Sequence, residues 1–599
     1  DRVLELEGLN AFSVQGDMAV VPHFLRLTHP GDLTIDLSGI PDLLPPLAVM
    51  AAVRSGTTRF VNAARLRMKE SDRLASVTAA LTALASVAAC TDLDPVWYSE
   101  VTPETFFKTK NDVYSAMGRP FTHLYSSEMR GDGVGFWFLQ ELCADQFAVI
   151  QKEQKWTGGD WFRFQDHSWG TSNPFINNAW SLVTTGVALS LEVIEDLKAA
   201  DYDKVGFTEE DRAGHIAQMK TLIAYFYLRG LDFYGGMPIY EGTVGVDPQP
   251  RSSAKDTYLH IEGLLKESLK VLPLKDETTE IDYTINRGAA AVLLARLYFN
   301  AHTYINEDHY SECETLCNEI MSGTYGDYSM ASDWREPFGF NNLNSAENIW
   351  VLPSALNKLQ NNTYTAWFYQ PNMMDQFFGL KGAGTMNGIT IMPSHKPNGD
   401  LYTDADFKLG RPFARFNDAD LRKKCYKYNG NGDYEGQLLF GPIAKNGTPV
   451  IVSGQNSVHD GKQLELVDYV GRTSLVGITY PSLDAVPSTK YEGEENTGVR
   501  LIKYPIAPDD DPNQWKAGFV MARLAEVQYM LAECKWRDGD KGEAARLIND
   551  VRKRNFENEV DPDPCTAGNL DEWRMLAEWG IEFLGEGRRR TDLLRWDKF

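Results

Sequence analysis

The fold of most of this chain follows from one stretch, Ala290-Ala-Val-Leu-Leu-Ala-Arg-Leu-Tyr-Phe-Asn-Ala301. Its residues 290, 293, 294, 297, 298 and 301 are apolar or aromatic, and this spacing places them on one face of an α-helix. After a short turn, the same spacing returns in Cys313, Leu316, Cys317, Ile320 and Met321. The two segments predict a pair of amphipathic helices, with Cys313 and Cys317 in the core.

Three other pairs of helical segments have the same apolar spacing. They are 104–116 with 177–197, 216–234 with 257–272, and 520–534 with a partner that starts at Ala544. Asp538-Gly539-Asp540 separates the last two, because Asp and Gly favour a helix end. Pairs of about 34 residues are typical of tetratricopeptide-like stacking. The sequence therefore predicts a mainly α fold, an αα superhelix of tetratricopeptide-like helix pairs with long insertions.

The largest insertion is the segment 323–518, in which Gly, Asn, Asp, Pro and aromatic residues replace the helical pattern. Only short strand-like runs occur there, at 347–352, 450–452 and 499–503. We interpret this segment as a loop-rich, irregular subdomain between a helical part at 96–322 and a C-terminal helical repeat part at 519–599. Long ordered loops on a rigid scaffold are often where ligands bind.

The chain before residue 86 differs in composition from the rest. Residues 1–89 carry a net charge of 8 − 9 = −1, whereas the whole chain carries 59 − 83 = −24. All 14 Trp and all 26 Tyr lie from Trp97 onward. Short strand-like runs at 3–6 and 33–37 alternate with helical stretches at 45–53 and 70–84, which predicts a small α/β fragment over residues 1–85.

The two parts meet in a seam at residues 86–95, just after the alanine-rich end of the first part. Within the seam, Val87-Ala-Ala-Cys90 resembles a bacterial lipobox, in which a small-residue cleavage site precedes a cysteine that becomes lipidated. Such a site belongs near an N-terminus, after a short basic region. We therefore interpret the chain as two unrelated coding sequences joined near 81–89. Cys90 is then the lipid attachment site of the second part's parent protein, and an unmodified cysteine in this chain.

Composition excludes several classes of function. The net charge of −24 argues against nucleic acid as a partner, because binding to phosphates needs clustered Lys and Arg. No run of about 18 apolar residues predicts a membrane-spanning helix. The seven Cys show no CxxC pair and no Cys/His cluster with zinc spacing, so the sequence predicts no metal and no cofactor. The cysteines leave the redox compartment open.

Three phrases in the first part are similar to the C-terminal domain of the 5-enolpyruvylshikimate-3-phosphate synthase family. The phrases are Gln15-Gly-Asp17, Ile40-Pro-Asp-Leu-Leu-Pro45 and Arg65-Leu-Arg-Met-Lys-Glu-Ser-Asp-Arg-Leu74. The resemblance implies that Asp42 and Glu70 transfer protons and that Lys69 and Arg73 bind anionic substrate. It also implies a two-domain enzyme of six repeats, of which this fragment supplies about one and a half. We therefore expect an incomplete, inactive piece, since catalysis needs a preorganised, water-excluding site.

Phrases throughout residues 90–599 resemble the SusD/RagB family of nutrient-binding outer-membrane lipoproteins. They are Cys90-Thr-Asp-Leu-Asp-Pro95, Val101-Thr-Pro-Glu-Thr-Phe-Phe107, Tyr225-Phe-Tyr-Leu-Arg-Gly-Leu-Asp-Phe-Tyr-Gly-Gly-Met-Pro238, Arg287-Gly-Ala-Ala-Ala-Val-Leu-Leu-Ala-Arg-Leu-Tyr298, Leu501-Ile-Lys-Tyr-Pro505, Arg523-Leu-Ala-Glu-Val-Gln-Tyr-Met-Leu-Ala-Glu-Cys534 and Glu582-Phe-Leu-Gly-Glu-Gly-Arg-Arg-Arg-Thr-Asp-Leu-Leu-Arg-Trp596. Family members usually continue for some tens of residues past the last phrase, so the resemblance implies that a closing segment is missing after Phe599.

The SusD/RagB resemblance implies four tetratricopeptide-like units, a variable subdomain and no catalysis. It implies a surface-exposed lipoprotein of the cell outer membrane that is lipid-anchored rather than membrane-spanning. The expected ligand is an oligosaccharide, and the expected partner is a SusC-like, TonB-dependent outer-membrane transporter that receives it. Which glycan is bound lies in variable loops that one sequence does not decode.

Aromatic and polar side chains suited to a sugar are densest in Lys155-Trp-Thr-Gly-Gly-Asp-Trp-Phe-Arg-Phe-Gln-Asp-His-Ser-Trp169. Sugar rings stack on aromatic faces, and their hydroxyls need short polar groups. The predicted ligand-binding residues are Trp156, Asp160, Trp161, Arg163 and Trp169. The alternative is that this segment is a strand that packs into the core.

Two neighbouring interpretations accompany this site. Trp367-Phe-Tyr369 in the loop-rich segment is a second candidate aromatic platform. His167, beside Asp166, is expected to make a structural hydrogen bond rather than to act as an acid or base. The basic run Arg588-Arg-Arg590 is expected to form salt bridges at a helix end rather than to bind anions.

Three functions compete on the sequence alone. The first is non-catalytic glycan binding and delivery to a transporter. The second is an enzyme, either the truncated 3-phosphoshikimate 1-carboxyvinyltransferase or a glycosidase whose carboxylate spacing the sequence does not reveal. The third is a tetratricopeptide-type adaptor that binds peptides, which the aromatic-rich insertions disfavour.

Overall fold

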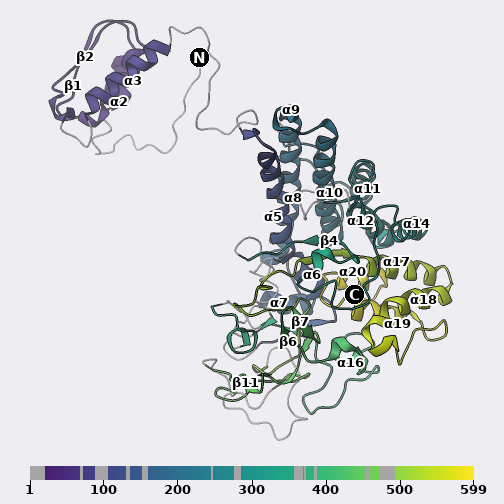
Figure 1. The fold of residues 1–599 in the computed structure, drawn as a ribbon. Helices are drawn as coiled ribbons and strands as arrows, with labels where there is room; N and C mark the ends of the chain where they lie inside the picture. The colour runs from purple at the N-terminus through teal and green to yellow at the C-terminus, as the bar shows by residue number, and fades with distance from the viewer. Residues whose placement is uncertain are drawn as a thin grey trace. The chain divides into compact units, whose positions relative to one another are not determined.

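The computed structural model divides the chain into two compact units, unit 1 at Asp1–Val101 and unit 2 at Thr102–Phe599 (Figure 1). The structure describes residues 20–67, 72–87, 106–129, 135–151, 159–243, 247–275, 285–356, 368–369, 373–382, 388–453, 459–471 and 493–599. Val3–Leu6, predicted as a strand, and Cys90 lie outside the described residues.

Unit 1 is the small α/β fragment that its sequence predicts. Strand β1 (Leu33–Asp36) pairs in parallel with β2 (Thr58–Val61), with Leu33 opposite Thr58 and Asp36 opposite Val61. Its helices are α1 (Val20–Leu27), α2 (Leu44–Ala52) and α3 (Arg73–Val87), with short 3₁₀ turns at Pro41–Leu43 and Ala64–Arg67. The buried core is Leu27, Ile35, Leu37, Leu43, Leu44, Leu47, Ala48 and Leu66.

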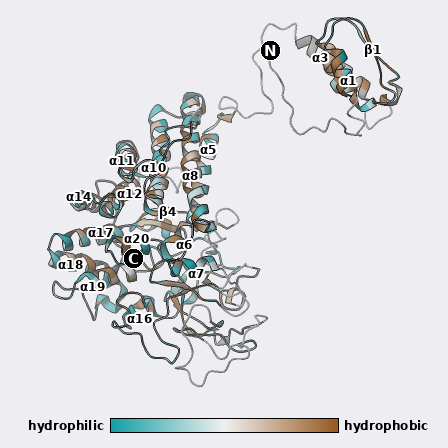
Figure 2. Cartoon of the chain, turned by 180° about the vertical axis from the view of Figure 1, so that it is seen from behind, coloured by the Kyte–Doolittle hydropathy of each residue, from teal (hydrophilic) through white to brown (hydrophobic). Residues whose placement is uncertain are grey.

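Unit 2 is built from the predicted helix pairs, which confirms the mainly α fold class. The pairs are α5 (Lys110–Met129) with α8 (Pro174–Ala199), α10 (Glu209–Tyr234) with α11 (Ala254–Ser268), α12 (Arg287–Phe299) with α14 (Tyr310–Met321), and α17 (Leu524–Arg537) with α18 (Lys541–Arg552). Helix α10 also packs on α8, and α14 on α17, so consecutive pairs are in contact. Polar and apolar residues alternate along the long helices, as α8 and α10 show in Figure 2.

Side-chain caps decide where several of these helices begin. The Thr208 hydroxyl accepts from the backbone N–H of Asp211, and the Asp211 carboxylate accepts from the N–H of Thr208. Such a capping box satisfies two N–H groups that a helix start leaves unpaired. Asn173, Ser253, Asn286 and Asp540 each accept from a first-turn N–H in the same way.

The close approach of α8 to α10 depends on Gly186. A Cβ atom at this position would lie 2.4 Å from a ring atom of Phe226 on α10. We expect Gly186→Ala to lower the free energy of unfolding by about 1–3 kcal/mol, because overpacking a dense core forces side chains or backbone to shift. Urea unfolding followed by tryptophan fluorescence measures this change.

Gly263 on α11 is the matched control for that substitution. A Cβ atom there would meet nothing within 4 Å. Gly263→Ala is expected to raise the free energy of unfolding by about 0.5–1 kcal/mol, since alanine favours a helix interior over glycine. Equal effects of the two substitutions would show that the helix contact at Gly186 is not tightly packed.

The predicted start of the helix at 520–534 is wrong. The apolar spacing from Val520 predicted a helix, but residues Phe519–Arg523 form strand β14, and α17 begins at Leu524. Strand β14 pairs antiparallel with β4 (Asn348–Leu352), with Val520 opposite Val351. The five residues of β14 are all buried, so the pairing with β4 satisfies backbone groups that water cannot reach.

The segment 323–518 is loop-rich, with short strands that pair locally or with distant segments. Strand β5 (Ile389–Ile391) pairs with β3 (Phe147–Val149), β6 (Lys427–Gly430) with β7 (Asp433–Glu435), β8 (Leu438–Leu439) with β13 (Arg500–Leu501), β9 (Gly441–Pro442) with β12 (Glu465–Leu466), and β10 (Ala444–Lys445) with β11 (Thr448–Pro449). The predicted strand at 450–452 contributes only an isolated bridge between Ile451 and Gln463.

The remaining elements of unit 2 are short. They are α6 (Phe136–Glu141), α7 (Gly159–Gln165), α9 (Tyr202–Val205), α13 (Ala301–Ile305), α16 (Pro412–Arg415), α19 (Glu572–Glu582), α20 (Arg589–Arg595), the π-helical turn Met373–Phe378, and 3₁₀ turns at Asn342–Asn344, Leu421–Lys423, Lys553–Asn555 and Glu557–Glu559. Within the ranges described, no helix is both long and apolar enough to cross a membrane.

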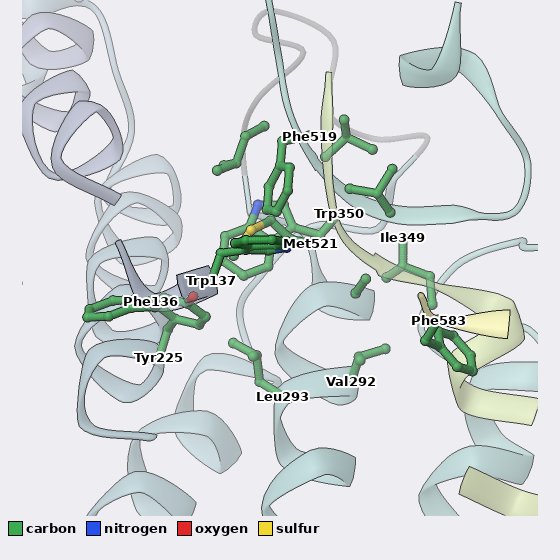
Figure 3. Packing of buried hydrophobic residues seen from close by; sticks show 14 of the residues in the cluster. Phe136, Trp137, Tyr225, Val292, Leu293, Ile349, Trp350, Phe519, Met521 and Phe583 are labelled. Atoms are coloured by element: carbon green, nitrogen blue, oxygen red, sulfur yellow. The ribbon is translucent and has the colours of Figure 1, made fainter. Parts of the chain in front are cut away.

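The core of unit 2 joins segments from its whole length. In Figure 3, Phe136 and Trp137 of α6 lie near Tyr225 of α10, Trp350 of β4 and Met521 of β14. The Trp137 indole N–H donates to the carbonyl of Gly585 at 2.8 Å. Residues predicted to belong to a helical part, a loop-rich subdomain and a C-terminal part therefore share one core.

A cluster of buried charges holds the same three regions together. Arg523, which is 1% exposed, donates to Glu347 at 3.0 Å, to Glu582 at 2.9 Å and to Glu586 at 2.8 Å. Arg554 also donates to Glu347 and Glu582. The cluster therefore crosslinks β14, the turn before β4, the turn after α18 and the end of α19.

The basic run Arg588-Arg-Arg590 forms the predicted salt bridges at the start of α20. Arg588 pairs with Asp592 at 3.0 Å, Arg589 with Asp145 at 2.7 Å, and Arg590 with Asp232 at 3.1 Å. These three acceptors come from α20 itself, from the turn after α6 and from α10. The run therefore ties the C-terminal helix to the N-terminal half of unit 2.

Candidate functional site

The segment that holds the predicted binding residues is a helix, not the strand considered from its sequence. Residues Gly159–Gln165 form α7, and Trp161, Phe162 and Phe164 are its buried residues. Trp156 lies outside the described residues. A helix here divides the predicted residues between an inner and an outer face, because side chains three or four apart share a side.

Trp161 lies on the inner face of α7. The residue is 1% exposed, and its ring meets Phe138 edge-on at 5.0 Å and Phe175 at 5.7 Å. The ring of a buried tryptophan offers no free face to a ligand. In this structure, Trp161 stabilises the core and holds α7 against α6 and the start of α8.

Asp160 and Arg163 lie on the outer face of α7. Their side chains form an ion pair of 2.6 Å and remain 35% and 51% exposed, respectively. The side-chain amide of Asn173, the N-cap of α8, donates to Asp160 at 3.4 Å. A guanidinium and a carboxylate thus stand side by side on the surface, where each retains capacity for further hydrogen bonds.

Trp169 is exposed just after α7. The residue is 37% exposed, and its ring contacts His167 at 5.4 Å and Phe164 at 6.1 Å. His167 has φ +50° and donates from Nε2 to the carbonyl of Cys143 at 2.9 Å, which confirms the predicted structural hydrogen bond. The His167 ring also stacks on Phe599 at 4.5 Å.

We name the exposed side chains of Asp160, Arg163, His167 and Trp169 the Trp169 surface. It combines an indole face, a second flat ring, and donors and acceptors one helical turn apart. Flat apolar faces flanked by short polar groups suit a ligand that has both C–H faces and hydroxyls.

The second predicted aromatic platform, Trp367-Phe-Tyr369, does not form an exposed surface in the residues that the structure describes. Trp367 lies outside the described residues, while Phe368 and Tyr369 are each 1% exposed. The Tyr369 hydroxyl donates to the carbonyl of Leu501 at 2.6 Å. Phe368 and Tyr369 therefore belong to the core.

Sequence reasoning missed an aromatic cavity of about 410 Å³ between α8 and the segment 237–243. Trp180, Tyr227 and Tyr240 line it, together with Thr184 and Thr243. The wall is held in place because Thr243 donates from its hydroxyl to Glu195 at 2.6 Å and the Tyr227 hydroxyl donates to the carbonyl of Pro238 at 3.1 Å. The sequence signal was the helical spacing of Trp180 with Val183, Val187 and Leu191.

The residues that the synthase resemblance singled out are only partly described. Asp42 is exposed in the 3₁₀ turn Pro41–Leu43, and Arg73 is the first residue of α3. Lys69 and Glu70 lie outside the described residues. Among all residues that are described, no group of three or more His, Cys, Asp or Glu is arranged to hold a metal ion.

Comparison with family models identifies two segments. Residues 303–599 match the SusD family, and residues 15–97 match the EPSP synthase (3-phosphoshikimate 1-carboxyvinyltransferase) family. The first match covers α14 and the C-terminal half of unit 2, and the second covers unit 1. Both resemblances that the sequence phrases carry are thereby confirmed.

Individual relatives agree with this division. The starch-binding protein SusD of Bacteroides thetaiotaomicron is 23% identical over 66% of this chain and 66% of its own length. The 3-phosphoshikimate 1-carboxyvinyltransferase of Clostridium acetobutylicum is 38% identical over 94 residues, which span 22% of that enzyme. The chain thus covers about two-thirds of the first relative and about a fifth of the second.

Solved structures show the same fold over most of the chain. The surface glycan-binding protein A from Bacteroides fluxus superposes with a TM-score of 0.55 at 17% identity, covering 82% of this chain and 89% of its own. The surface glycan-binding protein A from Bacteroides thetaiotaomicron, in complex with laminarihexaose, superposes with a TM-score of 0.53 at 18% identity, covering 82% and 91%. Residues 303–599 of this chain are thus similar to the SusD family, the fold of the surface glycan-binding proteins extends over 82% of the chain, and residues 15–97 are similar to the EPSP synthase family.

Proposed function

We propose that unit 2 binds an oligosaccharide and that the Trp169 surface is the place of contact. The observation that carries the proposal is the exposed indole of Trp169, which follows α7 in the chain, together with the exposed Asp160–Arg163 pair on α7. An indole face packs against the C–H face of a sugar ring, while the carboxylate and the guanidinium bond to its hydroxyls. The fold supports the proposal, because it is shared with a surface glycan-binding protein that was solved with laminarihexaose.

The finer role follows from the family resemblance. The bound oligosaccharide is passed to a SusC-like, TonB-dependent transporter in the outer membrane. The parent protein of residues 90–599 is held at the cell surface by lipid on the cysteine that corresponds to Cys90. The lipid anchor is tested in a protein whose N-terminal signal peptide ends at the lipobox in the seam. Globomycin, which blocks cleavage at lipoboxes, should prevent removal of that signal peptide. Co-purification with the transporter from detergent-solubilised outer membranes tests the partnership.

The chain has no catalytic role in this proposal. Unit 1 spans 22% of the synthase that it is similar to, and by resemblance the substrates of that family lie between two domains. Enolpyruvyl transfer to shikimate 3-phosphate by the full chain would overturn this part of the proposal. Release of reducing sugar from a bound polysaccharide would favour a glycosidase instead.

Replacing Trp169 with alanine tests the binding surface directly. We expect the affinity for the best-binding oligosaccharide on a glycan array to fall about 10- to 100-fold, because the loss of one aromatic stacking contact costs about 1–3 kcal/mol. Isothermal titration calorimetry with that oligosaccharide measures the change. The change in free energy of unfolding should be small, because the residue is exposed.

Phe407→Ala provides the matched control. Phe407 is 53% exposed and lies on another segment of unit 2. If the two alanine variants bind the oligosaccharide equally well, the Trp169 surface is not the binding site. Binding of peptides but of no glycan would instead indicate the tetratricopeptide-type adaptor.

A further inference from the structure

The aromatic cavity between α8 and the segment 237–243 has no part in the function proposed above, and we name it the Trp180 cavity. Its volume is about 410 Å³. An apolar cavity of about 150 Å³ is enough to bind benzene, and the ligand pockets of proteins commonly measure about 300–1,000 Å³. The Trp180 cavity is therefore large enough for a ligand that contains an aromatic ring and a short substituent.

One side of the cavity is a continuous stripe of α8. The residues of this stripe follow the helical spacing i, i+3, i+4, i+7, i+8 and i+11, and they are Trp180, Val183, Thr184, Val187, Ala188 and Leu191. Eleven residues of an α-helix rise about 16 Å. The cavity thus extends along about three turns of α8 and is not a small gap between two side chains.

The opposite wall, the segment 237–243, is fixed by hydrogen bonds to α10 and to α8. The backbone N–H of Tyr240 donates to the Tyr227 hydroxyl at 3.0 Å. Nearer the end of the wall, the backbone N–H of Thr243 donates to the Glu195 carboxylate at 2.8 Å. A wall that is fixed in this way resists collapse onto α8. The cavity is therefore preformed, which reduces the ordering that a ligand must impose when it binds.

The lining selects an uncharged ligand. Among the described residues, none of those that line the cavity is an acid or a base, although the whole chain carries a net charge of −24. Glu195 fixes the wall from outside the lining and is engaged by the N–H and the hydroxyl of Thr243. A charged group that entered this lining would lose its hydration without gaining an ion pair, which costs free energy.

The lining also favours an aryl group over a sugar ring. Val183, Val187 and Leu191 are buried aliphatic side chains on the α8 side of the cavity. Sugar hydroxyls against this side would find no hydrogen-bond partner, and burying them unpaired costs free energy. An aryl group needs no such partner. It also gains from contact with the rings of Trp180 and Tyr240, because pairs of aromatic rings attract beyond the burial of their area.

One polar group of the wall suits an oxygen of the ligand. The Tyr240 hydroxyl accepts from the backbone N–H of Gln249 at 3.1 Å, and its own O–H remains available to donate. The Tyr227 hydroxyl differs, because it donates to the carbonyl of Pro238 and accepts from the N–H of Tyr240. A carbonyl oxygen next to an aryl ring would accept the proton that Tyr240 offers.

We propose that the Trp180 cavity binds an uncharged aryl group that carries an ester, as in a cinnamate ester. The aromatic side chains contact the aryl ring, the aliphatic stripe of α8 packs against its C–H edge, and the Tyr240 hydroxyl donates to the ester carbonyl. The proposal goes beyond the proposed function, because it adds a second class of ligand at residues that do not belong to the Trp169 surface.

Ala188→Phe tests the site by filling it. Ala188 is exposed and lines the cavity, so an added ring takes the space of the ligand without entering the core. We expect this change to weaken the binding of ethyl ferulate, an uncharged cinnamate ester, at least about tenfold by isothermal titration calorimetry. Thr185→Phe is the matched control, because Thr185 is also exposed on α8 but does not line the cavity. It should leave the affinity unchanged.

Trp180→Leu removes one ring from the lining and keeps an apolar side chain. The affinity for ethyl ferulate should fall about three- to tenfold, the effect of one aromatic pair. In protein labelled with 5-fluorotryptophan, the ¹⁹F signal that Trp180→Leu removes should shift when ethyl ferulate is added. Thermal unfolding confirms that each variant folds, and the ¹⁹F signal locates the ligand even if Ala188→Phe does not fold. Trp169→Ala should change neither the affinity nor this shift.

Three further probes test the class of ligand. The ferulate ion should bind at least about tenfold more weakly than its ethyl ester, because the lining offers its charge no partner. Equal binding of the ion would overturn the assignment to an uncharged group. If ethyl decanoate binds more tightly than ethyl ferulate, the cavity takes an acyl chain and the aryl assignment is wrong. Displacement of ethyl ferulate by laminarihexaose would make the cavity a saccharide site instead.

Failure of this proposal is distinguishable from failure of the proposed function. If ethyl ferulate does not bind the wild-type chain, or if neither Ala188→Phe nor the ¹⁹F signal of Trp180 responds, the aryl site is wrong. Glycan binding and its loss in Trp169→Ala are measured with other probes, so that result stands or falls separately.

Discussion

Replacing Arg523 with methionine is expected to lower the free energy of unfolding of unit 2 by about 3–5 kcal/mol, the cost of breaking a buried ion pair. Arg523 is 1% exposed and donates to Glu347, Glu582 and Glu586. Methionine fills much of the volume of the arginine side chain, but it leaves the three carboxylates with fewer cations beside them. Their charge is then buried without compensation, which costs far more than the loss of one surface pair.

The same cluster predicts how the stability of unit 2 depends on acid. Burial raises the pKa of Glu582, but Arg523, Arg422 and Arg554 outweigh burial and hold the pKa well below the usual range. Glu586 is held down in the same way by Arg523 and Lys503. Carboxylates with depressed folded-state pKa values stabilise the protein above their unfolded pKa, and this contribution is lost as the pH falls. Arg523→Met should reduce the loss of stability on acidification.

Urea unfolding followed by tryptophan fluorescence measures the effect of Arg523→Met, because all 14 Trp lie from Trp97 onward. The control is Arg546→Met. Arg546 also pairs with two carboxylates, Glu543 and Asp550, but its side chain is 57% exposed. That variant should change the free energy of unfolding by less than about 1 kcal/mol. Similar losses in the two variants would contradict a stabilising role for the buried cluster.

Replacing Glu141 with glutamine is expected to remove a pH dependence of up to about 3 kcal/mol from the stability of unit 2. Glu141 is fully buried at the end of α6, and burial raises its pKa to about 7. Its Oε1 accepts from the N–H of Gly587 at 2.8 Å and of Arg588 at 3.1 Å, which lowers the pKa in part. Arg589 lowers it further, and Asp592 raises it.

The sign of this effect follows from the raised pKa. In the unfolded chain the group ionises near pH 4.5, whereas in the folded chain it stays protonated up to about pH 7. The stabilising contribution is therefore complete below pH 4.5 and is lost as the pH rises through 7. Glutamine keeps a neutral acceptor for both N–H groups. Glu141→Gln should thus match the wild type near pH 4.5 and exceed it at pH 8.

Urea unfolding from pH 4.5 to pH 8 measures this difference, and Glu267→Gln is the control of opposite sign. The ion pair with Lys220 lowers the pKa of Glu267, which is exposed, so its substitution should cost a little stability at pH 8 and less at acid pH. If the difference between the wild type and Glu141→Gln is constant with pH, Glu141 is ionised in the folded protein throughout the range.

The local sequence pattern was sufficient to predict the helix pairs. The apolar spacing in 290–301 and 313–321 predicts α12 and α14, and both helices bury that face, with Cys313 and Cys317 in the core. In residues 1–85, the alternation of strand-like runs with helical stretches likewise predicts the α/β character of unit 1, where β1 and β2 lie side by side. A helix face or a strand is a property of residues close in sequence, so periodicity alone detects it. The sequence likewise predicted that the basic run Arg588-Arg-Arg590 forms salt bridges with acidic side chains.

Tertiary contacts decided the rest. Phe519–Arg523 continues a helical spacing but becomes β14, because β4 supplies hydrogen bonds across about 170 residues of sequence. Trp161 and Trp169 are alike in the printed sequence, yet α7 turns the first into the core and leaves the second exposed. The cavity lined by Trp180, Tyr227 and Tyr240 forms only where α8, α10 and the segment 237–243 meet. The sequence by itself determined the two family resemblances and the helical scaffold, because both depend on residues close together in the chain. Exposure, on which any binding surface depends, arose only when segments far apart packed together.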